Sequence, residues 1–316
     1  MVNSYFALGY KCNHNCINCP LSTFDRLHGQ LNQKVIQENV NNLVKNGDDL
    51  HVTISGGEPT LHPEFLNVLG VLGESNAFIT VLSNGTRCAD MSFVDLMIDS
   101  LGEEYDFNRF KYITAIHSNR SEIHDLLTGV EGSFKESISG IKNLDSRHLN
   151  IMIKHIMNKK SLSSMKDLVN FVTDFYSNNV GLQFCSMDFS GRCRKNVGEL
   201  YASNDIIGPY LEESLDEFER KKDNCGRRLE IIETPLCIVD PYYWKYYCLS
   251  GLGKLEYIAP NEESENNRST ITSSCHTNYL ECQDCDVKSY CDGVWESTYE
   301  IEKDKSKVLQ KVKVII

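Results

Sequence analysis

Short apolar runs alternate with longer amphipathic stretches through the first two thirds of the chain. Six runs rich in Val, Ile, Phe or Thr end in turn residues and are predicted strands: 5–9, 51–55, 77–83, 111–117, 150–157 and 180–186. Apolar residues with helical spacing lie between them, as in the stretch that begins at Val35 and stops at Gly47 and in 161–177. Ser133 and Glu136 predict a capping box at the start of another helix. The alternation predicts an α/β fold in which a parallel sheet forms a barrel or partial barrel with helices outside it.

The pattern changes after about residue 200. A charged surface helix is predicted at 211–222, a strand at 229–232, and an acidic, solvated loop at 260–267. Four cysteines follow within 275–291 with little apolar material among them, which is typical of a segment organised by metal. We therefore predict a barrel over 1–200, a linker with the surface helix over 201–230, and a small second domain over 231–316.

Composition excludes several classes of protein. Hydrophobic residues make up 41% and charged residues 24% of the 316 residues, as in ordinary soluble globular proteins. No apolar run reaches the ~18–20 residues that span a bilayer, and the N-terminus lacks the features of a signal peptide, so we expect a cytoplasmic protein that does not bind membranes. The net charge of −12 argues against nucleic acid as a partner and favours a peptide or a small molecule.

Thirteen cysteines are an odd number and form a poor disulfide framework in a chain with no secretory signal. Cys12, Cys16 and Cys19 follow the first predicted strand as C-x3-C-x2-C. Three thiolates at this spacing can hold three corners of a cubane iron–sulfur cluster and leave one iron open to another ligand. A zinc site completed by His14 or His28, or three unremarkable thiols, is the alternative.

A glycine turn follows the second predicted strand. Gly56 and Gly57 allow the backbone to approach a ligand closely, and Glu58 can accept a hydrogen bond from an amine. The alternative is a simple turn before a helix, because Pro59 is a good helix opener.

Together, the cysteine loop and the Gly56–Pro59 turn resemble the radical S-adenosylmethionine (SAM) superfamily. The resemblance implies a partial (β/α)6 TIM-like barrel and a [4Fe-4S] cluster whose open iron binds the amine and carboxylate of SAM. It also implies that 56–59 lines the methionine amine and that SAM is cleaved reductively to a 5′-deoxyadenosyl radical. Family members often have an aromatic residue before the third cysteine, where this chain has Asn18.

Further segments extend the resemblance. Ser83 and Asn84 match a turn that lies near SAM in the family, and 123–134 resembles a run found in radical SAM enzymes with auxiliary clusters. Ser118 and Asn158 follow predicted strands and are interpreted as polar contacts to SAM, with loop capping as the alternative.

The C-terminal cysteines resemble the auxiliary-cluster domain called SPASM, or its shorter relative, the twitch domain. Cys282, Cys285 and Cys291 are spaced C-x2-C-x5-C, and the resemblance makes Cys237 the fourth ligand of one auxiliary [4Fe-4S] cluster. A structural zinc site of four thiolates is the alternative, and Cys248 and Cys275 are alternative ligands.

The segments from Pro235 to Asp240 and from Glu281 to Gly293 resemble those of the radical SAM maturase of the His-Xaa-Ser peptide system. This resemblance implies an enzyme that abstracts hydrogen from a ribosomally made precursor peptide and forms a crosslink or another oxidative modification. Its expected partners are that peptide, an electron donor such as flavodoxin or ferredoxin, and a partner maturase or peptide-recognition protein, since no recognition domain is expected before the barrel. A radical SAM dehydrogenase or epimerase acting on a small molecule or peptide, and a zinc-stabilised interaction protein, are the alternatives.

Overall fold

The computed structural model describes residues 2–45, 50–221, 226–248, 255–260, 267–271, 275–277 and 279–312. The predicted helix stop at Gly47, most of the predicted loop 260–267, and Cys225 lie outside these residues, as do the side chains of His28 and Cys275.

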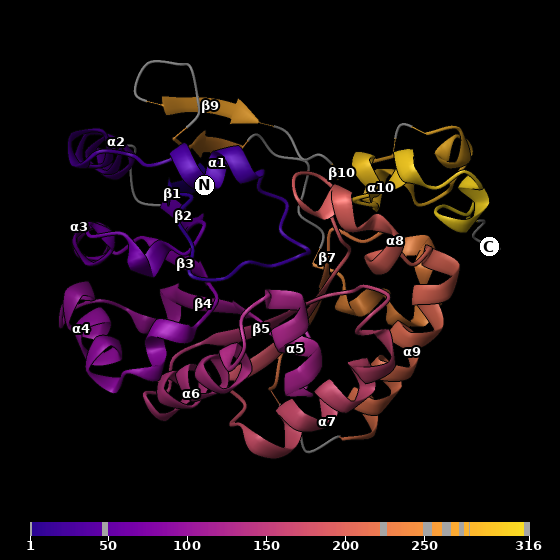
Figure 1. Ribbon diagram of the computed structural model, residues 1–316, viewed down its shortest axis with the longest axis horizontal. Helices are drawn as coiled ribbons and strands as arrows, with labels where there is room; N and C mark the ends of the chain where they lie inside the picture. Colours follow the sequence, from indigo (N-terminus) through magenta and orange to yellow (C-terminus); the bar gives the residue numbers. More distant parts are fainter. Residues whose placement is uncertain are drawn as a thin grey trace.

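One nine-stranded sheet organises the molecule, in the order β7-β6-β5-β4-β3-β2-β1-β8-β9. Neighbouring strands from β7 to β8 are parallel, and β9 is antiparallel to β8. Its strands are β1 (Val2–Gly9), β2 (Leu50–Gly56), β3 (Phe78–Ser83), β4 (Phe110–Ala115), β5 (Ile151–Ile156), β6 (Val180–Cys185), β7 (Leu229–Ile232), β8 (Leu255–Ile258) and β9 (Arg268–Ile271). The sheet is an open arc, because β7 and β9 lie at its two ends (Figure 1). The expected partial barrel is therefore confirmed, with strands on both sides of the predicted domain boundary near residue 230.

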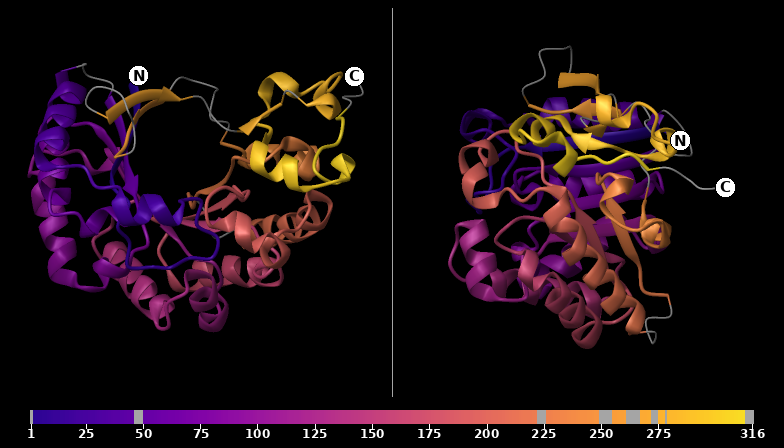
Figure 2. Two further views of the ribbon diagram at one scale, coloured as in Figure 1. Left: turned by 45° about the horizontal axis from the view of Figure 1, so that its top comes forward. Right: turned by 90° about the vertical axis from the view of Figure 1, so that its right-hand side faces the viewer.

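Most of the helices lie along the outer side of this arc, whereas the first, in indigo, lies within its opening and the last, in yellow, at its C-terminal tip (Figure 2). The helices are α1 (Thr23–His28), α2 (Gln33–Lys45), α3 (Phe65–Glu74), α4 (Met91–Leu101), α5 (Ser121–Thr128), α6 (Ser133–Ser146), α7 (Met165–Phe175), α8 (Val197–Leu200), α9 (Asn204–Arg220) and α10 (Glu296–Ile301). Amphipathic spacing explains their packing, since α7 buries Met165, Leu168, Val169 and Val172 against the main core. A small sheet of β10 (Cys275–His276) and β11 (Val294–Trp295) lies in the C-terminal region.

Two details of the sequence prediction are wrong. The capping box at Ser133 does not form, because the N-terminus of α6 is capped by Asp125 of the preceding helix. The Asp125 carboxylate accepts the backbone N–H groups of Gly132 and Phe134, each at 2.8 Å. Helix α9 begins at Asn204 rather than at 211, because Ile207 and Leu211 continue its buried face through Pro209.

The fold places its chemistry at the carboxyl ends of the parallel strands, as such barrels do. The loop after β1, drawn in indigo, crosses the opening of the arc (Figure 1). The C-terminal segment, drawn in yellow, lies at the other tip of the arc (Figure 2).

Candidate active-site cavity and cysteine sites

A cavity at the carboxyl ends of β1 to β5 brings the two N-terminal motifs together. Cys12, Cys16 and Cys19 all line it, opposite Gly56 and Gly57. The three thiols interact electrostatically, since charge on Cys12 or Cys19 raises the pKa of Cys16. Burial is the larger cause and brings that pKa to about 12. Three thiols that share one cavity fit an iron–sulfur cluster, whose positive charge offsets the cost of ionising them.

The backbone of the cysteine loop is held from two sides. On one side, Asn15 and Ile17 donate their N–H groups to the carbonyls of Thr128 and Leu127 at the end of α5, at 2.8 and 2.9 Å. On the other side, the segment after β6 reaches the loop, and Asn196 Nδ2 donates to the Ile17 carbonyl at 2.8 Å. These bonds fix the backbone from which the three thiols extend into the cavity.

The glycine turn lies directly against the cysteine loop. Gly57 N–H donates to the Gly9 carbonyl at 2.8 Å, and Glu58 N–H donates to the Lys11 carbonyl at 2.9 Å. A Cβ atom on Gly56 would lie 2.1 Å from the Gly9 carbonyl oxygen, and its φ of +128° is one that other residues rarely adopt. Only glycine permits this approach of the turn to the backbone of the cysteine loop, and the predicted approach to a ligand stays a prediction.

Glu58 has a different position from the one predicted. Its side chain is 2% exposed and is not among the residues that line the cavity. One carboxylate oxygen accepts hydrogen bonds from Thr60 N, Thr60 Oγ1 and Ser83 Oγ, and the other accepts Asn84 N–H at 2.7 Å. Burial raises the pKa of Glu58, although the hydrogen bonds oppose the rise. The carboxylate thus ties the glycine turn to Ser83 and Asn84, which do line the cavity.

Three other predicted contacts also lie outside the cavity lining. Pro59 opens a 3₁₀ turn behind the glycines. Ser118 is buried, where its hydroxyl donates to Ser164 Oγ at 2.9 Å and accepts Arg120 N–H. Asn158 is buried and caps its own turn, accepting Lys160 N–H at 3.1 Å.

Further polar side chains line the cavity. His14 and Asn18 belong to the cysteine loop that the sequence singled out, whereas Tyr5, His117 and Lys154 were missed by sequence reasoning. Three of their buried atoms, His14 Nε2, Asn18 Oδ1 and His117 Nδ1, have no hydrogen-bond partner among the described residues. Buried polar atoms without partners are costly, so they indicate a place for a polar ligand.

Lys154 is the cavity's most unusual side chain. It lies on β5 among buried apolar residues and pairs with Glu233 at 3.7 Å between Nζ and Oε2. Burial lowers the pKa of Lys154, but the interactions with Cys185 and Glu233 outweigh it, so the net pKa is raised. The ammonium is therefore charged at neutral pH. Sequence reasoning missed Lys154, although a lone lysine within an apolar predicted strand is a signal that could have identified it.

The C-terminal cysteines also gather in space. Burial raises the pKa of Cys237 to about 12, and interactions with Cys291, Cys282 and Cys285 add to the rise. Backbone N–H groups of Leu236 and Gly293 each point at the sulfur of Cys291 at 3.3 Å, and Gln310 N–H points at Cys237 at 3.4 Å. Hydrogen bonds of this kind stabilise the thiolates of iron–sulfur clusters, so these four cysteines fit such a group.

The other cysteines whose side chains the structure describes lie elsewhere. Cys248 is exposed, and its pKa is raised first by partial burial and then by the charge of Glu230, with none of the four gathered thiols among the causes. Cys88, Cys185 and Cys193 are buried. Within the described ranges, no three His, Cys, Asp or Glu side chains are grouped so as to hold a metal ion. A cluster is larger than one ion and spaces its thiolates more widely.

A search of the described helices finds none with the length and apolar character that crossing a membrane requires.

Comparisons with known proteins agree with this geometry. A model of the radical SAM superfamily matches residues 7–172. The antilisterial bacteriocin subtilosin biosynthesis protein AlbA of Bacillus subtilis (strain 168) is 26% identical over 249 residues, which are 71% of this chain and 51% of AlbA. The mycofactocin maturase MftC of Mycobacterium tuberculosis is 21% identical over 177 residues, which are 53% of this chain and 41% of MftC. The chain thus spans about half the length of the curated relatives it matches.

A solved structure shares the fold over nearly the whole chain. The crystal structure of Streptococcus suis SuiB bound to the precursor peptide SuiA aligns with a TM-score of 0.65 and 15% identity. The alignment covers 98% of this chain and 75% of the SuiB chain. At this identity the likeness extends to the fold alone.

Proposed function

Because the chain belongs to the radical SAM superfamily, we propose that it is a peptide maturase. In this proposal it cleaves SAM reductively and abstracts hydrogen from a ribosomally made precursor peptide, leaving a crosslink or another oxidative modification. The observation that carries the proposal is one cavity lined by three cysteines, a glycine turn and a buried lysine. The similarity to AlbA, named for bacteriocin biosynthesis, and to MftC, named as a maturase, supports this choice of substrate.

Cys12, Cys16 and Cys19 would hold a [4Fe-4S] cluster and leave one iron open for SAM. When bound, the cluster supplies the electron that cleaves SAM to a 5′-deoxyadenosyl radical. The protein's part is to position SAM and exclude water. The buried atoms without partners, on His14, Asn18 and His117, would bond to polar groups of SAM or of bound water.

Lys154 would pair with the carboxylate of SAM, since its ammonium is the charged group that β5 contributes to the cavity. Gly56 and Gly57 would lie against the methionine end, where a Cβ atom has no room. Ser83 and Asn84 would contact SAM directly. Glu58, Pro59, Ser118 and Asn158 would act by fixing the turns behind these contacts.

Cys237, Cys282, Cys285 and Cys291 would hold one auxiliary [4Fe-4S] cluster with no open iron. With four protein ligands, such a group would supply an electron acceptor and would leave no iron open for the substrate to bind. An oxidative product needs an electron acceptor. An external donor such as flavodoxin or ferredoxin would supply the first electron, and a peptide-recognition partner would deliver the precursor.

The test is the reaction of the anaerobically reconstituted chain with SAM, dithionite and the short peptide encoded beside it in its genome. We expect mass spectrometry to find a peptide that has lost the mass of H2, and 5′-deoxyadenosine to form with it. In the Cys16→Ala variant both products are expected to disappear. A chain that forms 5′-deoxyadenosine but modifies only a small molecule would contradict the peptide substrate.

A further inference from the structure

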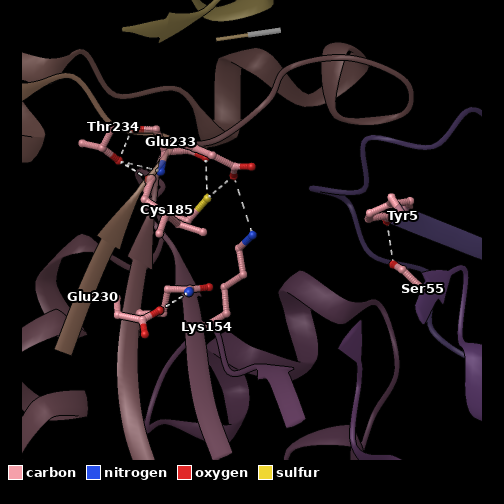
Figure 3. Close-up of polar contacts among 10 residues, drawn as sticks. Tyr5, Ser55, Lys154, Cys185, Glu230, Glu233 and Thr234 are labelled. Atoms are coloured by element: carbon pink, nitrogen blue, oxygen red, sulfur yellow. Dashed lines mark hydrogen bonds and ion pairs between the residues drawn. The ribbon is translucent and has the colours of Figure 1, made fainter. Parts of the chain in front are cut away.

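Three functional groups meet at the carboxyl ends of β5, β6 and β7, beside the cavity. They are Lys154, Cys185 and Glu233, and Figure 3 shows their side chains pointing toward one another, across from Tyr5 and Ser55. Lys154 itself lines the cavity. The residues that line this described cavity include no aspartate or glutamate, so Glu233 is the carboxylate that the cavity's lysine meets.

Both contacts of the Glu233 carboxylate are made by the same oxygen atom. Glu233 Oε2 accepts the Cys185 thiol at 2.9 Å and lies 3.7 Å from Lys154 Nζ. Across the described part of the chain, no hydrogen bond reaches its other oxygen, Oε1. The side chain is 33% exposed, so that oxygen is available to a ligand.

Glu233 has a strained backbone conformation. Its φ is +51°, in the left-handed region that a side chain other than glycine's rarely adopts. The next residue is fixed, because Thr234 Oγ1 accepts Ser186 N–H at 3.1 Å and donates to the Ile232 carbonyl at 2.7 Å. Strained residues of this kind persist mainly at binding and catalytic sites.

The ion pair between Lys154 and Glu233 is long, so another partner can replace either residue. At 3.7 Å the ammonium is beyond the usual distance of a charge-assisted hydrogen bond, which is about 2.7–2.9 Å. If Lys154 turns to the carboxylate of SAM, Glu233 loses its cation. The Glu233 carboxylate, which is one third exposed, then keeps the Cys185 thiol as its hydrogen-bond donor and is open to another cation. Lys154 therefore occupies the place of that cation until SAM engages it.

We propose that Glu233 recognises a cationic side chain, lysine or arginine, of the peptide substrate once SAM has engaged Lys154. This inference rests on the proposed function and names the class of residue beside the reaction centre. The chain's net charge of −12 favours such a partner. Glu233 lies four residues before Cys237, so the peptide would be read between the SAM cavity and the C-terminal cysteines.

Glu230, on β7, provides a matched control for Glu233. Glu230 also precedes the C-terminal region on β7, but both of its oxygens are occupied, by Lys111 at 3.2 Å and by Gln183 at 2.8 Å. Its side chain is 18% exposed and does not line the cavity. Glu230→Gln removes the same charge from β7, the strand that Glu233 directly follows, without touching the proposed site.

The experiment measures peptide binding by saturation-transfer NMR, using N-acetyl-Gly-Lys-Gly-amide and its norleucine counterpart. With SAM present, we expect the reconstituted chain to bind the lysine peptide about tenfold more tightly than the norleucine peptide. Without SAM, the ratio is expected to fall about fivefold, because Lys154 then competes for Glu233. Glu233→Gln should abolish the preference, and Glu230→Gln should keep it.

A charge reversal guards against a variant that binds poorly for other reasons. The Glu233→Lys variant should bind N-acetyl-Gly-Glu-Gly-amide more tightly than the lysine peptide. A misfolded chain would not show such a reversed preference. A lysine preference that survives in Glu233→Gln, one that is equal with and without SAM, or no preference in the unaltered chain overturns the proposal. Because binding is measured without turnover, failure to form 5′-deoxyadenosine would count against the proposed function alone.

Discussion

Glu58 illustrates how a residue can serve a cofactor site without facing it. Its carboxylate is buried beneath the glycine turn and accepts hydrogen bonds from Thr60, Ser83 and Asn84. The pattern of the turn predicted an acceptor for an amine, whereas the groups that the carboxylate accepts in the structure are backbone N–H groups and hydroxyls of the protein itself. The backbone path that directs the carboxylate inward is set by contacts with Gly9 and Lys11. Those contacts are distant in sequence and could not be predicted from it.

Replacing Glu58 by glutamine should destabilise this turn. The amide would place an N–H group opposite the Asn84 N–H that the carboxylate now accepts, leaving both without an acceptor. We expect the free energy of unfolding to fall by about 2 kcal/mol. Urea unfolding of the variant measures this. Glu64→Gln is the control, since Glu64 accepts only an exposed hydrogen bond from Asn67, and equal stabilities of the two variants would contradict the account.

Buried histidines should make stability depend on pH. Burial lowers the pKa of His124 and that of His155 to about 4. The unfolded chain binds protons at these groups below about pH 6.5, whereas the folded chain binds them only near pH 4. The contribution of these neutral histidines to the free energy of unfolding is thus present in full above about pH 6.5 and is lost as the pH falls toward 4.

His124→Asn should reduce this loss. Between pH 7 and pH 5 we expect the variant's free energy of unfolding to drop by about 2 kcal/mol less than that of the unaltered chain. The asparagine oxygen can accept the His117 N–H that His124 Nδ1 now accepts at 3.2 Å. Urea unfolding at the two pH values gives the comparison. Parallel pH dependence in both proteins would count against the assignment.

At the scale of elements, the strands β1 to β7 were predictable, whereas β8, β9 and the capping of α6 were not. Alternation of apolar runs and helical spacing placed the barrel strands within a few residues, because burial on both faces of a parallel sheet demands apolar runs. Asp125 caps α6 in place of Ser133 because the chain folds α5 back onto that N-terminus. Lys154 was missed for the same reason, since its partner Glu233 lies two strands away.

The segment after β6 links the cysteine loop to the C-terminal region. Gly191, at φ +54°, approaches so closely that a Cβ atom would lie 2.0 Å from the Pro20 carbonyl oxygen. Cys193 N–H donates to the Cys19 carbonyl at 3.0 Å. Toward the C-terminus, Ser297 Oγ accepts Phe189 N–H at 2.9 Å and donates to Asp188 at 2.7 Å. This segment therefore supports the backbone that carries the third cysteine.

Gly191→Ala should displace the cysteine loop. We expect weaker iron binding at the first site and a changed electron paramagnetic resonance signal of its cluster, because the alanine Cβ overlaps the Pro20 carbonyl. Gly198→Ala is the control, since a Cβ there meets nothing within 4 Å. Spectra that match between the two variants would rule out this supporting role.

At the scale of the whole molecule, two cysteine sets lie at separate parts of one open barrel. One lines the cavity, and the other brings Cys237 together with cysteines of the C-terminal segment, which lies at a tip of the arc (Figure 2). The spacing of the cysteines indicated the two triplets, and the family resemblance added Cys237, which more than forty positions separate from Cys282 in the sequence.

The iron and sulfide content per chain after anaerobic reconstitution shows whether each set of cysteines holds a cluster. We expect about eight irons per chain, falling to about four when Cys12, Cys16 and Cys19 are replaced by alanine, and to about four when Cys282, Cys285 and Cys291 are replaced. About four irons that vanish in the first variant would mean that the C-terminal cysteines hold no cluster.

The most direct test of the central claim is the amount of 5′-deoxyadenosine formed from SAM by the reconstituted chain under dithionite. The account predicts its formation by the unaltered chain and by Cys88→Ala, whose buried thiol bonds to the Tyr112 hydroxyl outside the cavity lining. It predicts none from Cys16→Ala. Equal formation by Cys16→Ala, or none by the unaltered chain when iron is bound, would contradict the account.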